Sequence, residues 1–99
     1  MGHEAWTLLL LGEIAAQRGP ANAAPAESYY RQGLALAEAR GMRPLQAHCD
    51  CALGTLYAKT GRPELARIAL SAAIALYRDM AMTSWLPKAE ASLARGEGR

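Results

Sequence analysis

The stretch Ala52–Tyr77, ALGTLYAKTGRPELARIALSAAIALY, decides the fold, because it has the pattern of two amphipathic helices with a turn between them. Leu53, Leu56 and Tyr57 recur at i, i+3 and i+4, which is one stripe of a helix with 3.6 residues per turn. Gly61 stands where this stripe ends, at a position that tolerates a left-handed residue, and a proline follows at a favourable first helical position. The stretch therefore predicts a helical hairpin.

Small residues predict how closely the two helices of this hairpin cross. Gly54 and Ala66 lie on helix faces and allow the backbones to approach, so enlarging either residue is expected to overpack the crossing and cost about 1–3 kcal/mol. The second helix is expected to turn one apolar stripe inward, formed by Leu65, Ile68, Ala69, Ala72, Ala73, Leu76 and Tyr77.

The pattern of this hairpin resembles the tetratricopeptide repeat (TPR). The residues that carry the resemblance are Leu53, Gly54, Tyr57, Ala66, Leu70 and Ala73, and upstream Leu11, Gly12, Ala26, Tyr30 and Gly33. Gly12 and Gly54 are 42 residues apart, and Ala26 and Ala66 are 40 apart. The resemblance implies an all-α, right-handed solenoid of two and a half repeats, in which these residues are structural.

Periodicity and turn residues predict five helices within a single domain over residues 4–95. The expected helices cover residues 4–18, 25–40, 44–60, 63–80 and, with Thr83 or Ser84 as its cap, a last helix reaching about 95. Repeat one is residues 4–41, repeat two is 42–82, and 83–95 is a terminal capping helix; 1–3 read as an artificial start and 96–99 as a frayed tail.

Composition agrees with one helical domain and narrows the classes of partner. Ninety-nine residues, 52% hydrophobic with many Ala and Leu, suit close-packed helices. The net charge of +2 is spread over interspersed acids and bases, which is not the footprint of a nucleic-acid-binding protein. No apolar run reaches the roughly 20 residues that span a bilayer, and no secretory signal is evident, so a cytoplasmic location without membrane contact is expected.

The first helix is apolar on nearly every side, with Trp6, the leucines at 8–11, Ile14 and Ala15. Such a helix is normally covered on more than one side. Either a preceding repeat or another molecule is expected to pack there, which leaves a homodimer through this helix as one possible assembly. In the second helix, Tyr29, Tyr30, Leu34, Leu36 and Ala37 are expected to face inward, and Glu27, Arg31 and Glu38 outward.

The sequence offers little for catalysis or metal binding. His48-Cys49-Asp50-Cys51 is the densest cluster, but the two cysteines point about 200° apart on a helix and cannot share one ion, so we expect Cys49 in the core and Cys51 in a groove. Phosphate-loop, zinc-protease and nucleophile-elbow motifs do not occur. We therefore expect no enzyme activity, no cofactor and no metal. Arg40, Arg43 and Arg78 are interpreted as favourable charges at helix C-termini.

The best candidate site is a row of residues on the concave surface that the resemblance implies. The row consists of Trp6, Leu9, Glu13 and Gln17 in the first helix, His48, Cys51, Thr55 and Lys59 in the third, and Lys88 in the fifth. By resemblance to the repeat family, these positions contact a peptide. A solvent-facing row without a dedicated ligand fits the residues about as well.

The long repeat also resembles the C-terminal repeats of bacterial signalling proteins that join a nucleotide cyclase or regulatory domain to an ATPase. This resemblance covers about residues 26–95. It implies a non-catalytic protein–protein interaction module in the regulatory tail of a larger protein, with a protein or peptide as its partner. Two alternatives stay open: a self-assembling helical module, and a DNA-binding helical domain, although none of the expected helices begins with clustered Arg, Lys, Asn or Gln.

Overall fold

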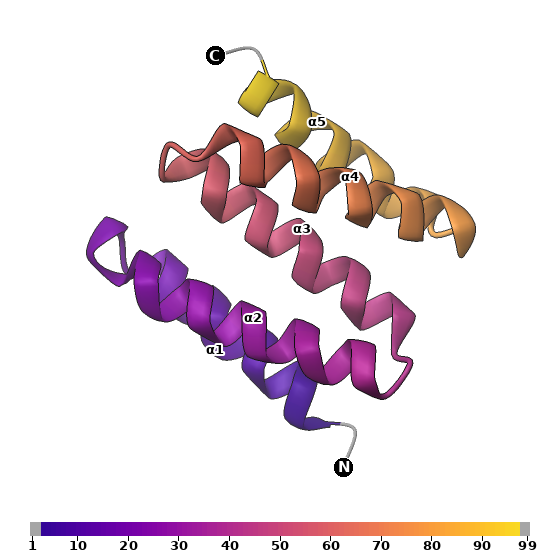
Figure 1. Cartoon of the computed structure of the whole chain (residues 1–99), viewed down its shortest axis with the longest axis horizontal. Coiled ribbons are helices and arrows are strands. Elements are labelled where there is room, and N and C mark those ends of the chain that lie inside the picture. The colour runs from indigo at the N-terminus through magenta and orange to yellow at the C-terminus, as the bar shows by residue number, and fades with distance from the viewer. Residues whose placement is uncertain (1–2, 98–99) are drawn as a thin grey trace.

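A computed structural model describes residues 3–97 of the chain, with the side chains of 4–19, 21–82 and 84–94. This part is all-α and contains no strand, which confirms the predicted fold class at that level (Figure 1). Its helices are α1 (His3–Gln17), α2 (Ala23–Ala39), α3 (Arg43–Lys59), α4 (Pro63–Asp79) and α5 (Leu86–Glu97), with short 3₁₀ turns η1 (Pro20–Asn22) and η2 (Thr83–Trp85).

The helices form two antiparallel hairpins and one returning helix. In Figure 1, α1 lies behind α2, α5 lies behind α4, and α3 runs between the two groups. Helix α3 contacts all four of the others, and α1 and α5 both reach it from the same side. The three odd-numbered helices therefore share one face of the molecule, and α3 is its centre.

Helix boundaries agree with the expected ones to within two residues for α1 to α4. Helix α5 begins at Leu86, later than predicted, because Thr83–Trp85 form a 3₁₀ turn before it, and neither Thr83 nor Ser84 directly precedes the helix. At the other end, α5 continues to Glu97, two residues beyond the predicted end near residue 95, and the fraying of the tail stays a prediction. The remaining tail residues 98–99, and residues 1–2 of the expected artificial start, lie outside the described part.

The turns that end the helices use a left-handed residue, as predicted for Gly61. Gly19, Gly41 and Gly61 have positive φ, and Ala81 takes the same conformation at φ 58° after α4. The N–H of Met82 donates to the carbonyl of Tyr77 at 2.8 Å, the bond that closes a Schellman turn. Ala81 is thus a non-glycine residue in a position that the same turns after α2 and α3 give to Gly41 and Gly61.

Glycine permits a close crossing in both hairpins. A Cβ built on Gly12 would lie 2.6 Å from ring carbons of Tyr30, and one built on Gly54 would lie 2.4 Å from Cγ of Leu70. The prediction that these two glycines touch a neighbouring helix is confirmed. Most other signature residues are buried as well: Ala26, Gly33, Leu53, Tyr57, Ala66 and Ala73. The exception is Leu11, which is exposed.

The apolar stripe of α4 is rotated by about one residue from the predicted one. Leu65, Ile68 and Ala72 were expected to face inward but are exposed, and Leu76 is half-buried. The buried residues are Ala66, Ala69, Leu70, Ala73, Ile74 and Tyr77. The physical reason is the contact at Gly54: once Leu70 fills the space beside it, the residues three and four positions from Leu70 face α3.

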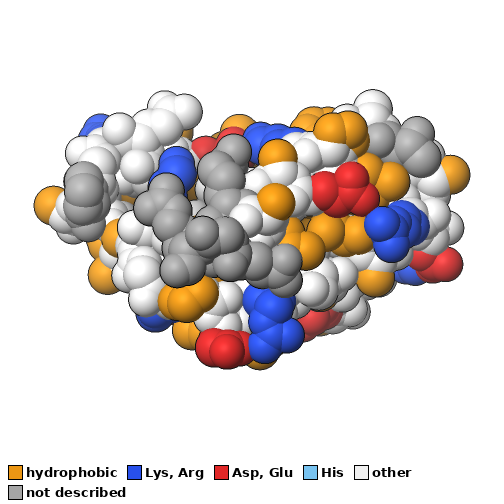
Figure 2. Space-filling view, turned by 90° about the horizontal axis from the view of Figure 1, so that it is seen from above, with side chains coloured by type: hydrophobic (Ala, Val, Ile, Leu, Met, Phe, Trp, Pro, Cys, Tyr) orange, Lys and Arg blue, Asp and Glu red, His pale blue; other side chains and the backbone are white. Residues whose placement is uncertain are grey.

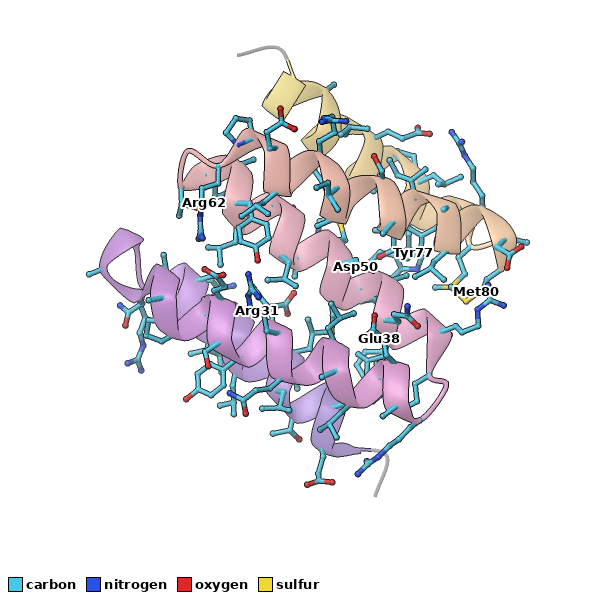
Figure 3. All side chains as sticks on the ribbon, in the orientation of Figure 1. Arg31, Glu38, Asp50, Arg62, Tyr77 and Met80 are labelled. Carbon is cyan, nitrogen blue, oxygen red and sulfur yellow. The ribbon has the colours of Figure 1, made fainter. Side chains whose placement is uncertain are left out.

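A charged cluster joins the two hairpins, and it corrects the expected outward position of Glu27. The Glu27 carboxylate, half-buried, accepts hydrogen bonds from Arg31 (2.9 Å), Arg62 (2.7 Å) and the Tyr57 hydroxyl (3.2 Å). The guanidinium of Arg62 also lies 4.7 Å from the centre of the Tyr57 ring. Figure 3 shows Arg31 and Arg62 reaching into this junction from α2 and from the turn before α4. The hydrogen bond from Arg62 lowers the pKa of Glu27, so the carboxylate is ionised at neutral pH.

Candidate binding groove

A cavity of about 390 Å³ opens on the face shared by α1, α3 and α5. Its walls come from α1 and from the η2–α5 segment, and α3 runs along its floor. The lining residues are Trp6, Leu9, Leu10, Glu13, Ala16, Tyr30, His48, Cys51, Ala52, Thr55, Leu56, Lys59, Tyr77, Trp85 and Lys88. We call this cavity the groove.

Aromatic side chains from four elements meet at one end of the groove. The His48 ring is 5.9 Å from Trp6, 4.5 Å from Trp85 and 5.5 Å from Tyr77, measured between ring centres. Its Nδ1 is 2.8 Å from the Tyr77 hydroxyl, in a hydrogen bond that fixes the imidazole. Tyr77 is fully buried, whereas Trp6 and Trp85 are each about two-fifths exposed. The indoles therefore present apolar surface on both sides of a fixed central ring.

His48 is neutral at neutral pH. Burial lowers its pKa, and the positive charge of Lys88 acts in the same direction, while the negative charge of Glu13 opposes them. Because the neutral imidazole has an apolar ring face, this end of the groove is an uncharged aromatic surface.

The middle of the groove is small and weakly polar. The Thr55 hydroxyl donates to the backbone carbonyl of Cys51 at 2.9 Å and lies 3.4 Å from the Ser92 hydroxyl of α5. Burial raises the pKa of Cys51, so its sulfur is an uncharged thiol, and the buried Cys49 thiol has its pKa raised to about 12. Neither cysteine has the thiolate character that reactive cysteines need.

Three charged side chains line the groove, and they differ from most other charges of the protein. Six ion pairs occur among the described residues, for example Arg40 with Glu4 and Arg78 with Glu90. Glu13, Lys59 and Lys88 take part in none of these ion pairs and in no hydrogen bond between described side chains. On the face seen in Figure 2, basic and acidic side chains lie interspersed with hydrophobic ones. The groove thus combines apolar walls with three charged side chains that form no ion pair or hydrogen bond with other described side chains.

Most of the predicted row comes together in this cavity. Eight of its nine residues line the groove, namely Trp6, Leu9, Glu13, His48, Cys51, Thr55, Lys59 and Lys88, whereas Gln17 is exposed at the end of α1 and does not. Whether the row binds a partner stays a prediction. The sequence interpretation missed seven lining residues, namely Leu10, Ala16, Tyr30, Ala52, Leu56, Tyr77 and Trp85. Leu10, Ala52 and Leu56 directly follow predicted residues, so a wider stripe could have found them; Tyr77 and Trp85 carried no such signal.

The four residues His48-Cys49-Asp50-Cys51 do not form one site, because their side chains lie in different parts of the structure. Cys49 is in the core and Cys51 in the groove, as the residue types suggested, and Asp50 is buried on the opposite side of α3. Figure 3 shows Asp50 and Glu38 on the face where α2 and α4 lie in front of α3. Burial, with a smaller effect of Glu38, raises the pKa of Asp50 to about 7. Within the described residues no three His, Cys, Asp or Glu side chains are placed to hold a metal ion.

Comparison of the chain with protein-family models, with curated proteins and with solved structures gives no match. The likeness to the tetratricopeptide repeat therefore stays a resemblance in sequence pattern. None of the helices in the described part is long and apolar enough to cross a membrane.

Proposed function

We propose that this protein is a non-catalytic interaction module that binds a peptide segment of a partner protein in the groove. The observation that carries the proposal is the convergence of residues far apart in sequence on one cavity with exposed aromatic walls. Trp6, His48 and Trp85 come from α1, α3 and η2, and the rings of Trp6 and Trp85 each pack against the ring of His48. Concave, largely apolar sites with a few polar groups are typical of ligand binding.

A short TPR-like solenoid is the architecture that fits this proposal. The two close crossings at Gly12 and Gly54, 42 residues apart, support a repeated unit. In such a solenoid, the first helix of each pair lines the concave face; the common side on which α1 and α5 reach α3 supports this arrangement. A role in the regulatory tail of a bacterial signalling protein rests on the sequence resemblance alone.

Peptide display tests the proposal directly. Random peptides of about twelve residues span roughly 40 Å when extended, which is the length of the molecule's longest axis. Selection should enrich peptides that bind the protein but not the variant Thr55→Arg, which fills the floor of the groove. Ser71→Arg adds the same side chain at an exposed position of α4 outside the groove and should leave binding intact. Equal enrichment on the Thr55→Arg variant would refute groove binding.

Self-association through α1 is a second candidate, favoured by the exposed apolar side chains Leu10, Leu11 and Ile14. Light scattering at micromolar concentration should then give twice the monomer mass, and Leu10→Glu should restore the monomer. Ile68→Glu is the matched control, because Ile68 is at least as exposed as Leu10 but lies on α4. A monomer mass for the unchanged protein would dismiss this candidate.

A further inference from the structure

We infer that the segment bound in the groove is an acidic peptide with a large apolar anchor, placing an aromatic or branched aliphatic side chain between Trp6 and Trp85 and carboxylates opposite Lys88 and Lys59. This inference rests on the proposed function and specifies the chemistry of the partner.

The anchor follows from the aromatic end of the groove. His48 contacts both Trp6 and Trp85 and is itself held by the Tyr77 hydroxyl, so the surface is fixed before any ligand arrives. Both indoles remain partly exposed although each packs on the imidazole. A large apolar side chain laid against these rings would remove their exposed surface from water, which is the main driving force for such anchors.

The charges decide between two ligands that an aromatic surface can accept. Aromatic rings also bind cations such as Arg, Lys or a quaternary ammonium group. Here the charges of both Glu13 and Lys88 act on His48 in the aromatic cluster, and the effect of Glu13 is the larger. The preference for carboxylates therefore comes from the lining as a whole and not from the aromatic end alone. Across the groove the two lysines outnumber Glu13, which gives a net positive lining.

The spacing of the lysines predicts the spacing of the carboxylates. Lys88 lies three residues beyond Trp85 across the junction of η2 and α5, or about 5 Å, and Lys59 lies eleven residues beyond His48 along α3, or about 16 Å. An extended peptide advances about 3.3 Å per residue, and alternate side chains point to the same side. Carboxylates two and six positions from the anchor therefore come within reach of the two flexible lysine side chains, and a basic residue between them comes within reach of Glu13.

Two capped peptides of the same length test this pattern by fluorescence anisotropy. The matching peptide is Gly-Trp-Ala-Glu-Ala-Lys-Ala-Glu-Gly, and the charge-swapped peptide is Gly-Trp-Ala-Lys-Ala-Glu-Ala-Lys-Gly. The matching peptide should bind about tenfold more tightly or better, and the preference should weaken as salt is added. Replacing its Trp by Ala should abolish binding. Equal affinities for the two charged peptides would overturn the inference.

The double variant Lys59→Glu, Lys88→Glu supplies the reciprocal test. Both lysines are exposed, so the fold should tolerate the changes, and far-ultraviolet circular dichroism checks this. The variant should prefer the charge-swapped peptide while keeping its dependence on Trp; an unchanged preference would contradict the inference. The display experiment separates this inference from the proposed function. Peptides that bind the groove but contain no acidic residues would overturn the inference alone. If no displayed peptide depends on the groove, both the inference and the proposed function are overturned.

Discussion

Replacing Gly54 by Ala tests the helix crossing on which the second hairpin depends. The added methyl group would lie 2.4 Å from Cγ and 2.8 Å from Cδ2 of Leu70, where carbon atoms normally stay about 3.5–4.0 Å apart. Leu70 is fully buried and cannot swing into solvent. Overpacking of this kind costs about 1–3 kcal/mol, and the better helix propensity of Ala returns about 1 kcal/mol. We therefore expect a net loss of about 1 kcal/mol in the free energy of unfolding.

A double-mutant cycle separates this clash from other effects of the substitution. Leu70→Ala alone should cost about 2–5 kcal/mol, because it leaves a cavity. In that background the methyl group at position 54 meets no branched side chain but still lies 3.1 Å from the backbone nitrogen of residue 70, so the gain in helix propensity is offset and Gly54→Ala should be close to neutral. The cost of the substitution should thus disappear, with a coupling energy of about 1 kcal/mol measured by urea denaturation.

Gly33→Ala is the matched control for this cycle. A Cβ at Gly33 would have its nearest neighbours, the Ala5 carbonyl oxygen, the Cys49 sulfur and Cβ of Leu8, all at 3.4 Å. This is ordinary contact, so the gain in helix propensity should dominate and the variant should be as stable as the unchanged protein or slightly more so. The proposed crossing is wrong if Gly54→Ala stabilises the unchanged protein, or if its effect is the same in both backgrounds.

Three further substitutions, two of them paired with a control variant, test other features by their effect on unfolding. Ala81→Gly should raise the melting temperature by a few degrees, because it relieves a left-handed conformation worth about 1–2 kcal/mol, whereas Ala75→Gly within α4 should lower it. Burial raises the pKa of Asp50 to about 7 in the folded protein, whereas its pKa in the unfolded chain is near 3.8. Protonation of Asp50 therefore contributes stability that is fully present below pH 3.8 and is lost as the pH rises through 7. Asp50→Asn should therefore be more stable than the unchanged protein at about pH 8, by up to about 4 kcal/mol, and similar to it at about pH 4; parallel pH profiles would contradict this. Glu27→Gln should cost about 1–2 kcal/mol at neutral pH and progressively less as the pH falls through the lowered pKa of Glu27, while Glu64→Gln, which removes an exposed pair, should cost under about 0.5 kcal/mol.

The fold class and most helix ends were predictable because local signals specify them. Gly61 adopts the left-handed conformation that its place in the sequence suggested. The orientation of α4 was harder to predict, because apolar residues occur on several of its sides. Ile68 and Leu70 are both large and aliphatic, and only the space beside Gly54 on another helix decides which of them is buried.

The groove was predictable where a single helix determines the direction of its side chains. His48, Cys51, Thr55 and Lys59 follow the spacing of one helix face, and α3 keeps that face toward the cavity. Trp85 could not be placed in the same way, because it belongs to the 3₁₀ turn η2, where helical spacing does not apply. Tyr77 reaches the groove from the second helix of its hairpin, which the row of first helices did not include.

Burial in α1 shows why positions with matching sequence patterns need not have equivalent environments. Leu11 and Ile14 correspond to Leu53 and Leu56, each 42 residues later. The exposed fractions are 38% and 52% for the first pair, but 4% and 6% for the second. All four side chains suit a core, and what differs is that α3 has a preceding hairpin to pack against while α1 has none among the described residues. Local sequence sets which face of the helix is apolar, and only a neighbouring helix determines whether that face is buried. Ile14 should therefore become buried if α1 acquires such a neighbour. Amide hydrogen exchange in α1, compared with and without self-association, would report this change.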